Sequence, residues 1–268
     1  MSSADPSIPE ATIRTSTVLL VGLAAGFLSG MFGVGGGLLI VPALVLIVKI
    51  DQRIAHGTSL AAVLPISVAS LVTYWAQDHV DFRVALCLAI GAIGGAVIGT
   101  KLLHVLSHRT LSLAFSGLLI VTAIRLFMPI DGFARAPLSI AMILALVLVG
   151  LITGILAGLL GVGGGIVMVP AMMLLLGLPA ALAKGTSVAV IIPTAIMGTY
   201  RNRSSKNVNL RVAFIVGFGG IASAIVGGWI SAMMPDTLSN VLFACLLIVV
   251  ASRLLLQVRS DAKLGIVH

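Results

Sequence analysis

Charged residues are scarce in this sequence, and acidic ones are the scarcest. Only 9% of the 268 residues are Asp, Glu, Lys or Arg, whereas a soluble domain carries roughly 25%. The mean hydropathy of +1.22 excludes a soluble globular protein. Apolar runs of about 20 residues recur from end to end, as in helices that cross a membrane. We therefore predict an all-α polytopic membrane protein, since such long unbroken runs exclude an outer-membrane barrel.

Cysteine and buried acids are nearly absent, which removes several kinds of chemistry. The two cysteines, Cys87 and Cys245, lie inside apolar segments at non-equivalent positions, so we expect small core residues and neither a disulfide nor a metal site. No Asp or Glu lies in the middle of an apolar segment, although proton- and sodium-coupled carriers often bury a carboxylate there. Any coupling would need His56, backbone carbonyls or the substrate's own proton. We predict no cofactor.

Basic residues are in excess and give a net charge of +8, but they lie between the apolar segments. This placement indicates a lipid bilayer, not nucleic acid, as the partner, because cytoplasmic loops are enriched in Lys and Arg. Four basic residues fall outside the predicted cytoplasmic stretches, namely Arg83, Arg125, Arg135 and Lys184. The other twelve lie in residues 1–15, 49–54, 101–109, 201–211 and 253–268, so both termini are predicted to be cytoplasmic.

A unit of about 100 residues occurs twice, 128 positions apart. Gly-Val-Gly-Gly-Gly stands at 33–37 and again at 161–165, and no gap is needed between the copies from Gly26 to Leu126. The 201–211 loop is basic, whereas its counterpart 73–83 carries two aspartates, which favours two inverted repeats. The predicted organisation is an N-terminal tail 1–15, a first repeat 16–127, a linker 128–137, a second repeat 138–257 and a C-terminal tail 258–268.

Each repeat divides into five apolar segments, which predicts eight to ten helices. The second segment has about 13 residues in each copy and reaches only about 20 Å, less than the roughly 30 Å hydrocarbon core. It either crosses obliquely or dips into the membrane and returns. The second and third segments contain prolines that are expected to kink them and to expose carbonyls along a polar path, or else only to shape packing. These prolines are Pro42, Pro65, Pro170 and Pro193.

The glycine runs are the first candidate for a binding site. A helix that begins just after them, at Leu38 or Ile166, would present unpaired N–H groups and a positive dipole end to an anion. The alternative is close packing between helices, which small residues also serve. The candidate residues are Gly35, Gly36, Gly37, Gly163, Gly164 and Gly165.

The second candidate is a Gly-Thr-Ser triplet near the start of each third segment. The triplet follows His56 in the first repeat and Lys184 in the second. Hydroxyl groups, a lysine and a histidine can bind an oxyanion. The alternative is helix N-capping, with Lys184 reaching the membrane interface. The candidates are His56, Thr58, Ser59, Lys184, Thr186 and Ser187, while Arg125 and Arg253 are expected to be anchors at helix ends.

The doubled motif resembles a known family. Gly30-Met-Phe-Gly-Val-Gly-Gly-Gly37 with Pro42, and its copy at 158–165 with Pro170, resemble the sulfite exporter TauE/SafE family, as do the Gly-Thr-Ser triplets. The resemblance implies a bacterial inner-membrane permease for sulfur-containing anions such as sulfite or sulfoacetate. We expect an exporter that works by alternating access, with no enzymatic activity and an oligomeric state left open. The alternatives are a permease or channel for another anion, such as a carboxylate, and, more remotely, an intramembrane enzyme that uses Ser29 and His56.

Overall fold

The computed structural model describes residues 14–102, 137–161 and 163–263, together with isolated positions between 113 and 124. Within these residues every regular element is a helix, which confirms the predicted fold class. The predicted N-terminal tail, almost all of the linker, most of the fifth segment of the first repeat, and Arg125 and Arg135 lie outside the described residues.

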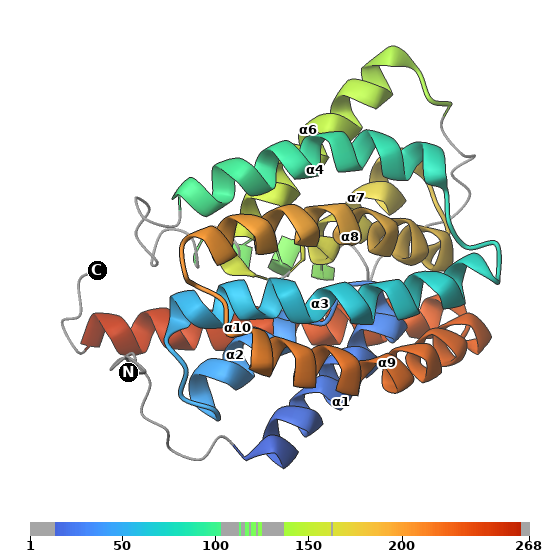
Figure 1. Ribbon diagram of the computed structural model, residues 1–268. Coiled ribbons are helices and arrows are strands. Elements are labelled where there is room, and N and C mark those ends of the chain that lie inside the picture. The colour runs from blue at the N-terminus through green and yellow to red at the C-terminus, as the bar shows by residue number, and fades with distance from the viewer. Residues whose placement is uncertain are drawn as a thin grey trace, which may run out of the picture.

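The helices follow the predicted segments closely. The first repeat contains α1 (Thr15–Phe32), α2 (Gly37–Leu46), α3 (Gln52–Trp75) and α4 (Phe82–Leu102). The second repeat contains α6 (Ile140–Leu160), α7 (Gly165–Leu176), α8 (Ala180–Ser204), α9 (Leu210–Met233) and α10 (Asp236–Lys263). Among the described residues, six helices, α1, α3, α4, α6, α8 and α9, are long and apolar enough to cross a membrane. The described part of the chain is therefore a polytopic helical bundle (Figure 1).

Helices α3 and α8 occupy equivalent places in the two repeats, and they pack side by side in opposite directions. A Cβ on Gly198 would lie 2.8 Å from Leu60 Cδ1, and a Cβ on Gly185 would lie 2.9 Å from Tyr74 Cβ. From Leu60 to Tyr74 along α3, the contacting residue on α8 changes from Gly198 back to Gly185, so the two helices are antiparallel. Equivalent helices that run in opposite directions are what inverted repeats require, so the predicted inversion is confirmed.

Two helix pairs form the most extensive contacts between the repeats. Helix α1 packs in parallel on α9, and α4 packs in parallel on α6. Glycines four residues apart form these seams, so that a Cβ on Gly91, Gly95 or Gly99 would overlap the carbonyl oxygen of Val147, Leu151 or Ile155. In lipid, where apolar side chains gain nothing by leaving the solvent, such close backbone approach is a main source of helix association. Each repeat is therefore stabilised chiefly by helices of the other.

Each short second segment folds back along the first and forms a helical hairpin with it. Helix α2 has ten residues and reaches only about 15 Å. It begins beside the middle of α1, since a Cβ on Gly36 would lie 2.6 Å from the Ala25 carbonyl oxygen. It then returns toward the start of α1, where Ile40 and Leu44 share an apolar cluster with Val18. The short segments thus return; they do not cross obliquely.

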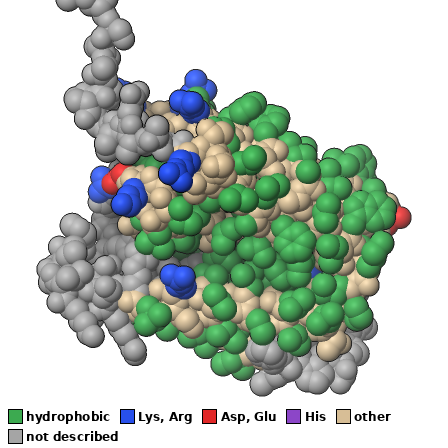
Figure 2. Space-filling model, turned by 90° about the horizontal axis from the view of Figure 1, so that it is seen from below, with side chains coloured by type: hydrophobic (Ala, Val, Ile, Leu, Met, Phe, Trp, Pro, Cys, Tyr) green, Lys and Arg blue, Asp and Glu red, His purple; other side chains and the backbone are tan. Residues whose placement is uncertain are grey.

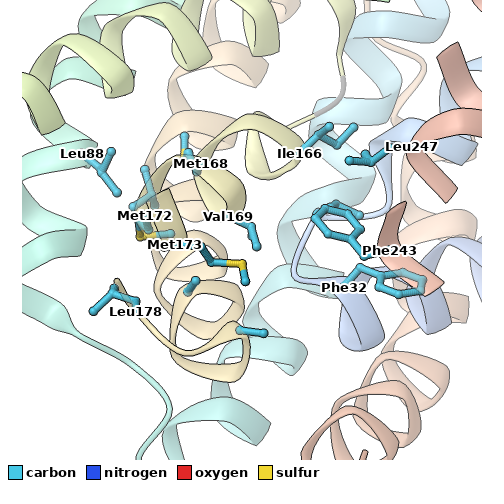
Figure 3. Packing of buried hydrophobic residues seen from close by; sticks show 14 of the residues in the cluster. Phe32, Leu88, Ile166, Met168, Val169, Met172, Met173, Leu178, Phe243 and Leu247 are labelled. Atoms are coloured by element: carbon cyan, nitrogen blue, oxygen red, sulfur yellow. The ribbon is translucent and has the colours of Figure 1, made fainter. Parts of the chain in front are cut away.

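The second hairpin is embedded in an apolar core drawn from both repeats. Met168 and Met172 of α7 lie near Leu88 of α4 (Figure 3). The same core extends to Phe32 at the end of α1, whose ring stacks on Phe243 of α10 with centroids 5.5 Å apart. Side chains of both repeats therefore pack against the second hairpin.

Basic side chains gather at one end of the molecule (Figure 2). This basic end carries the α2–α3 link, the end of α4 and the α8–α9 link, and its residues meet, as Gly57 does with Asn202. Its described cations are Lys49, Arg53, Lys101, Arg201, Arg203, Lys206 and Arg211. Of the stretches predicted to share one side, 49–54, 201–211 and the described start of 101–109 therefore lie at one end of the molecule. Their position in the cytoplasm stays a prediction.

Two expectations about single residues have different outcomes. Cys87 is half-buried, but Cys245 is exposed on the outer face of α10, so the prediction that it is a core residue is wrong. Its sequence context could not decide this, because an apolar helix in a membrane is apolar on its lipid face as well. Pro42, Pro65, Pro170 and Pro193 all lie inside continuous helices, and their kinks stay a prediction.

The seam between α4 and α6 can be tested with two neighbouring glycines. Gly95→Ala should lower the melting temperature in detergent, because its methyl group would overlap the Leu151 carbonyl, and overpacking of this kind costs about 1–3 kcal/mol. Gly94→Ala is the control, since its Cβ would meet only Leu151 Cδ1 at 3.8 Å. Equal melting temperatures for the two variants, measured by thermal size-exclusion chromatography, would contradict this account of the seam.

Candidate functional site

The tip of each hairpin is a turn that only glycine adopts easily. Gly36 and Gly164, which immediately precede α2 and α7, have φ angles of +75° and +78°. A side chain in this left-handed region costs about 1–2 kcal/mol. The preceding glycines of each motif are also left-handed, namely Gly33, Gly35, Gly161 and Gly163. The repeated motif is therefore a turn that reverses the chain and starts a helix at Gly37 or Gly165.

The two hairpin tips, which enter from opposite ends, meet where α3 and α8 cross. A Cβ on Gly165 would lie 2.5 Å from the Gly33 carbonyl oxygen. A Cβ on Gly35 would lie 3.1 Å from Val63 Cγ1 and 3.2 Å from Ile191 Cδ1. Val63 and Ile191 are repeat equivalents, so the tips pass each other on the pseudo-twofold axis. The structure thus brings the two glycine runs together.

The serines of the two triplets fasten each tip to the opposite repeat. Ser187 Oγ donates a hydrogen bond to the Gly33 carbonyl at 2.5 Å. Ser59 Oγ donates to the Gly161 carbonyl at 2.8 Å. Ser187 Oγ also lies 2.8 Å from the Lys184 carbonyl of its own helix, so its one proton is shared between that carbonyl and Gly33. The Ser59 proton is given to the opposite turn.

The threonines of the triplets do not cap their own helices. The N-cap of α3 is Asp51, whose carboxylate accepts from Arg53 N at 2.9 Å, and the N-cap of α8 is Pro179. The triplets lie in the second turn, so the N-capping alternative is wrong. Thr58 Oγ1 instead accepts from Asn209 N, and Thr186 Oγ1 accepts from Asp81 N, both at 2.9 Å. Each threonine thus binds the start of the next helix in space and keeps a hydroxyl proton to donate.

Lys184 lies deep inside the protein beside the first hairpin tip. Its side chain is only 1% exposed, so the alternative that it reaches out to the interface is wrong. Its Nζ donates to Ser231 Oγ at 3.1 Å and to Ser239 Oγ, and it lies 5.6 Å from the centroid of the Phe32 ring. A Cβ on Gly33 would lie 2.8 Å from Lys184 Cα. A cation is thus buried directly against a glycine turn.

Tertiary contacts add residues to this cluster that sequence reasoning missed. Tyr74 donates its hydroxyl to the Gly30 carbonyl at 2.6 Å and approaches Ser231 Oγ at 3.3 Å. Ser231 and Ser239 come from α9 and α10, far from the motif in the sequence. Comparison of the two repeats does not reveal these residues, because the positions equivalent to Tyr74 and Ser231 hold Asn202 and Leu103.

His56 is the counterpart of Lys184 at the second tip. It is 5% exposed, and its Nδ1 lies 2.6 Å from the Leu160 carbonyl oxygen, so Nδ1 carries the proton. A Cβ on Gly161 would lie 2.9 Å from His56 Cα, which mirrors the contact of Gly33 with Lys184. The two tips therefore face different groups, one a lysine and the other a histidine.

The surroundings of the tips suit an anion better than a metal ion. No described Asp or Glu side chain is buried, whereas Lys184 and His56 are. Among the described residues, no group of three or more His, Cys, Asp or Glu side chains is placed to hold a metal ion.

The sequence profile described as Sulfite exporter TauE/SafE matches the chain twice, over residues 18–148 and 146–266. The chain belongs to the TauE/SafE family. The second TauE/SafE match begins 128 positions after the first, which is the offset of the two glycine motifs. The two matches therefore have the same spacing as the internal duplication.

Relatives of this TauE/SafE chain are named as transporters. The Bacillus subtilis (strain 168) protein YunE, a probable membrane transporter protein, is 26% identical over 269 residues, which cover 90% of this chain and 97% of the relative. A probable membrane transporter protein of Xylella fastidiosa (strain Temecula1) is 29% identical, over 84% of this chain and 89% of the relative. No solved structure matches the chain. The protein is a multi-pass membrane transporter of the TauE/SafE family.

The serine bonds at the two tips can be tested by removing one hydroxyl. Ser59→Ala should lower the melting temperature, because it leaves the buried Gly161 carbonyl without this donor, at a cost of about 1–3 kcal/mol. Ser204→Ala is the control, since this exposed hydroxyl bonds only to the Tyr200 carbonyl of its own helix. Equal melting temperatures for the two variants in a thermal-shift assay would show that the Ser59 hydroxyl does not hold the turn.

Proposed function

We propose that this transporter carries a small sulfur-containing anion, such as sulfoacetate or sulfite, and that the anion binds where the hairpin tips meet. The observation that carries this proposal is the burial of Lys184 against the first glycine turn. A buried cation is costly unless polar partners surround it, and intramembrane ionisable groups usually mark a substrate path. The TauE/SafE family name supports the same class of substrate.

In this proposal, each part of the site has a separate task. The first N–H groups of α2 and α7, beside Gly35–Gly37 and Gly163–Gly165, have no partner within their helices and point their dipoles toward the bound oxygens. Lys184 supplies the charge, and the anion replaces a serine hydroxyl at its Nζ. Thr58 and Thr186 donate their remaining hydroxyl protons, while Ser59 and Ser187 keep the turns in place.

The inverted repeats suggest how the anion moves. Each hairpin is packed among helices of both repeats, so a rocking of one repeat against the other would open the site to alternate sides. By the positive-inside rule, we place the basic end and both termini in the cytoplasm, in a bacterial inner membrane. The inside-negative potential would then drive export, by about 2.3 kcal/mol per charge per 100 mV.

A carboxylate permease or channel is the second candidate, because a lysine, hydroxyls and helix N-termini bind carboxylates as well as sulfonates. The enzyme alternative has less support. Ser29 Oγ lies 3.4 Å from Ser70 Oγ, and the bond of His56 to the Leu160 carbonyl joins it to the second tip, so neither bond forms a serine–histidine pair. We therefore propose a carrier without catalytic activity.

Transport by proteoliposomes tests the site at Lys184. Lys184→Met should raise the KM for radiolabelled sulfoacetate by about tenfold to a hundredfold, since a hydrogen bond to a charged group contributes about 1.5–3 kcal/mol. Lys184→Arg keeps the charge and should retain more transport, and Lys206→Met makes the same change at an exposed position.

Wild-type kinetics in Lys184→Met would overturn the site. Competition by lactate as strong as by sulfite would favour the carboxylate permease. Flux that does not depend on substrate on the opposite side of the membrane would favour a channel over a carrier.

A further inference from the structure

A cavity of about 420 Å³ lies at the basic end, between the end of α4 and the α8–α9 link. Lys101 and Arg201 line it, with Tyr200, Asn207 and two serines, and none of the described residues in its wall is a carboxylate. Its volume falls within the range of about 300–1,000 Å³ that is typical of small-molecule sites. A cleft lined by charges of one sign concentrates ions of the opposite sign, so this cavity attracts anions.

The inner wall of the cavity reaches the residues beside the second hairpin tip. Asn202 is only 3% exposed, and its Cβ lies 3.0 Å from the position of a Cβ on Gly57, the neighbour of His56. Thr100 N lies 3.0 Å from the position of a Cβ on Gly158, which is three residues before the turn at Gly161. One layer of backbone and side chains thus separates the cavity from the His56 side of the proposed site.

The charges of the cavity do not come from the duplication. At the equivalent positions of the opposite end, Trp229 stands for Lys101, Thr73 for Arg201 and Tyr74 for Asn202. The Tyr74 ring is fully buried, and its hydroxyl is bonded to the Gly30 carbonyl. Two aromatic side chains, Trp229 and Tyr74, therefore stand at one end of the molecule, whereas the basic end has a cavity and two cations at the equivalent positions.

We propose that this cavity is an anion-binding vestibule, in which Lys101 and Arg201 hold a small sulfonate or carboxylate before it passes to the His56 side of the hairpin tips. The guanidinium fork of Arg201 matches two oxygens of such a group, and the ammonium of Lys101 adds a second charge. The passage step rests on the proposed function, whereas binding in the vestibule does not.

A reporter cysteine tests the binding with the full chain. Ser205→Cys, at the cavity wall, is made together with Cys87→Ala and Cys245→Ala and purified in zwitterionic detergent. Its reaction rates are measured with the anionic ethylsulfonate and the cationic trimethylammonium methanethiosulfonate reagents in 0.15 M salt, where exposed charges beyond about 8 Å are screened. The quantity compared is the ratio of the anionic to the cationic reaction rate. We expect this ratio to be about tenfold higher at the cavity cysteine than for a free thiol standard.

Two double variants separate the vestibule from general surface charge. Lys101→Gln with Arg201→Gln should abolish the anion preference at Ser205→Cys. Arg203→Gln with Lys206→Gln removes the same charge from exposed positions outside the cavity wall and should preserve most of it. Equal loss in both double variants would show that the basic residues act only through overall charge, and it would overturn the proposal.

Protection experiments identify the occupant and separate the two proposals. Sulfoacetate should slow the reaction of the anionic reagent with Ser205→Cys, and it should still do so when Lys184→Met is added, even though that substitution raises the KM for transport. Protection by phosphatidylglycerol in the detergent, with none by sulfoacetate, would assign the cavity to a lipid phosphate and overturn the vestibule. If sulfoacetate protects but Lys101→Gln with Arg201→Gln leaves the KM for transport unchanged, the passage step is wrong.

Discussion

Backbone contact between the two repeats is the constraint on which the rest of the structure depends. Helix α1 meets α9, and α4 meets α6, through glycines spaced four apart, at distances that exclude even a methyl group. Because each pair joins a helix of one repeat to a helix of the other, the inverted units interlock. This arrangement directs the two hairpins toward each other from opposite ends. The meeting of their tips is therefore a consequence of the seams, and the apolar cores around the hairpins fill the space that the seams define.

The polar interior follows from that meeting. A buried turn exposes carbonyls that need donors, and Ser59 and Ser187 supply them from the opposite repeat. Lys184 is surrounded by hydroxyls of Ser231 and Ser239 and by the Phe32 ring, which lowers the cost of burying its charge. Near-symmetric backbones thus carry unequal chemistry, since a histidine stands where the second lysine would be. Inequality of this kind is useful to a transporter, because the two ends of its path face different solutions.

The two alternative interpretations of the Gly-Thr-Ser triplets and Lys184 failed for one physical reason. A threonine or serine near a helix start is a good cap, and a lysine near an apolar segment commonly reaches the interface. Here the helices begin one turn earlier than the motif, at Gln52 and Ala180. That extra turn moves the triplets and Lys184 into the protein, where the opposite repeat supplies their partners. Local patterns describe the average surroundings of a residue, and a tightly interlocked bundle departs from that average.

The sequence by itself determined the membrane-spanning helices, the duplication, the inversion and the helix starts that follow the glycine runs. Each depends on a local or periodic property: apolar length, an offset of 128 residues, the distribution of Lys and Arg, and the left-handed backbone that Gly36 and Gly164 adopt. Only the tertiary structure decided that the short segments return, that α1 pairs with α9, and that Tyr74, Ser231 and Ser239 surround Lys184. These contacts join residues far apart in the sequence, such as Tyr74 and Ser231, which are 157 positions apart, and they depend on shape complementarity between helix surfaces. Neither composition nor spacing along one chain records that complementarity.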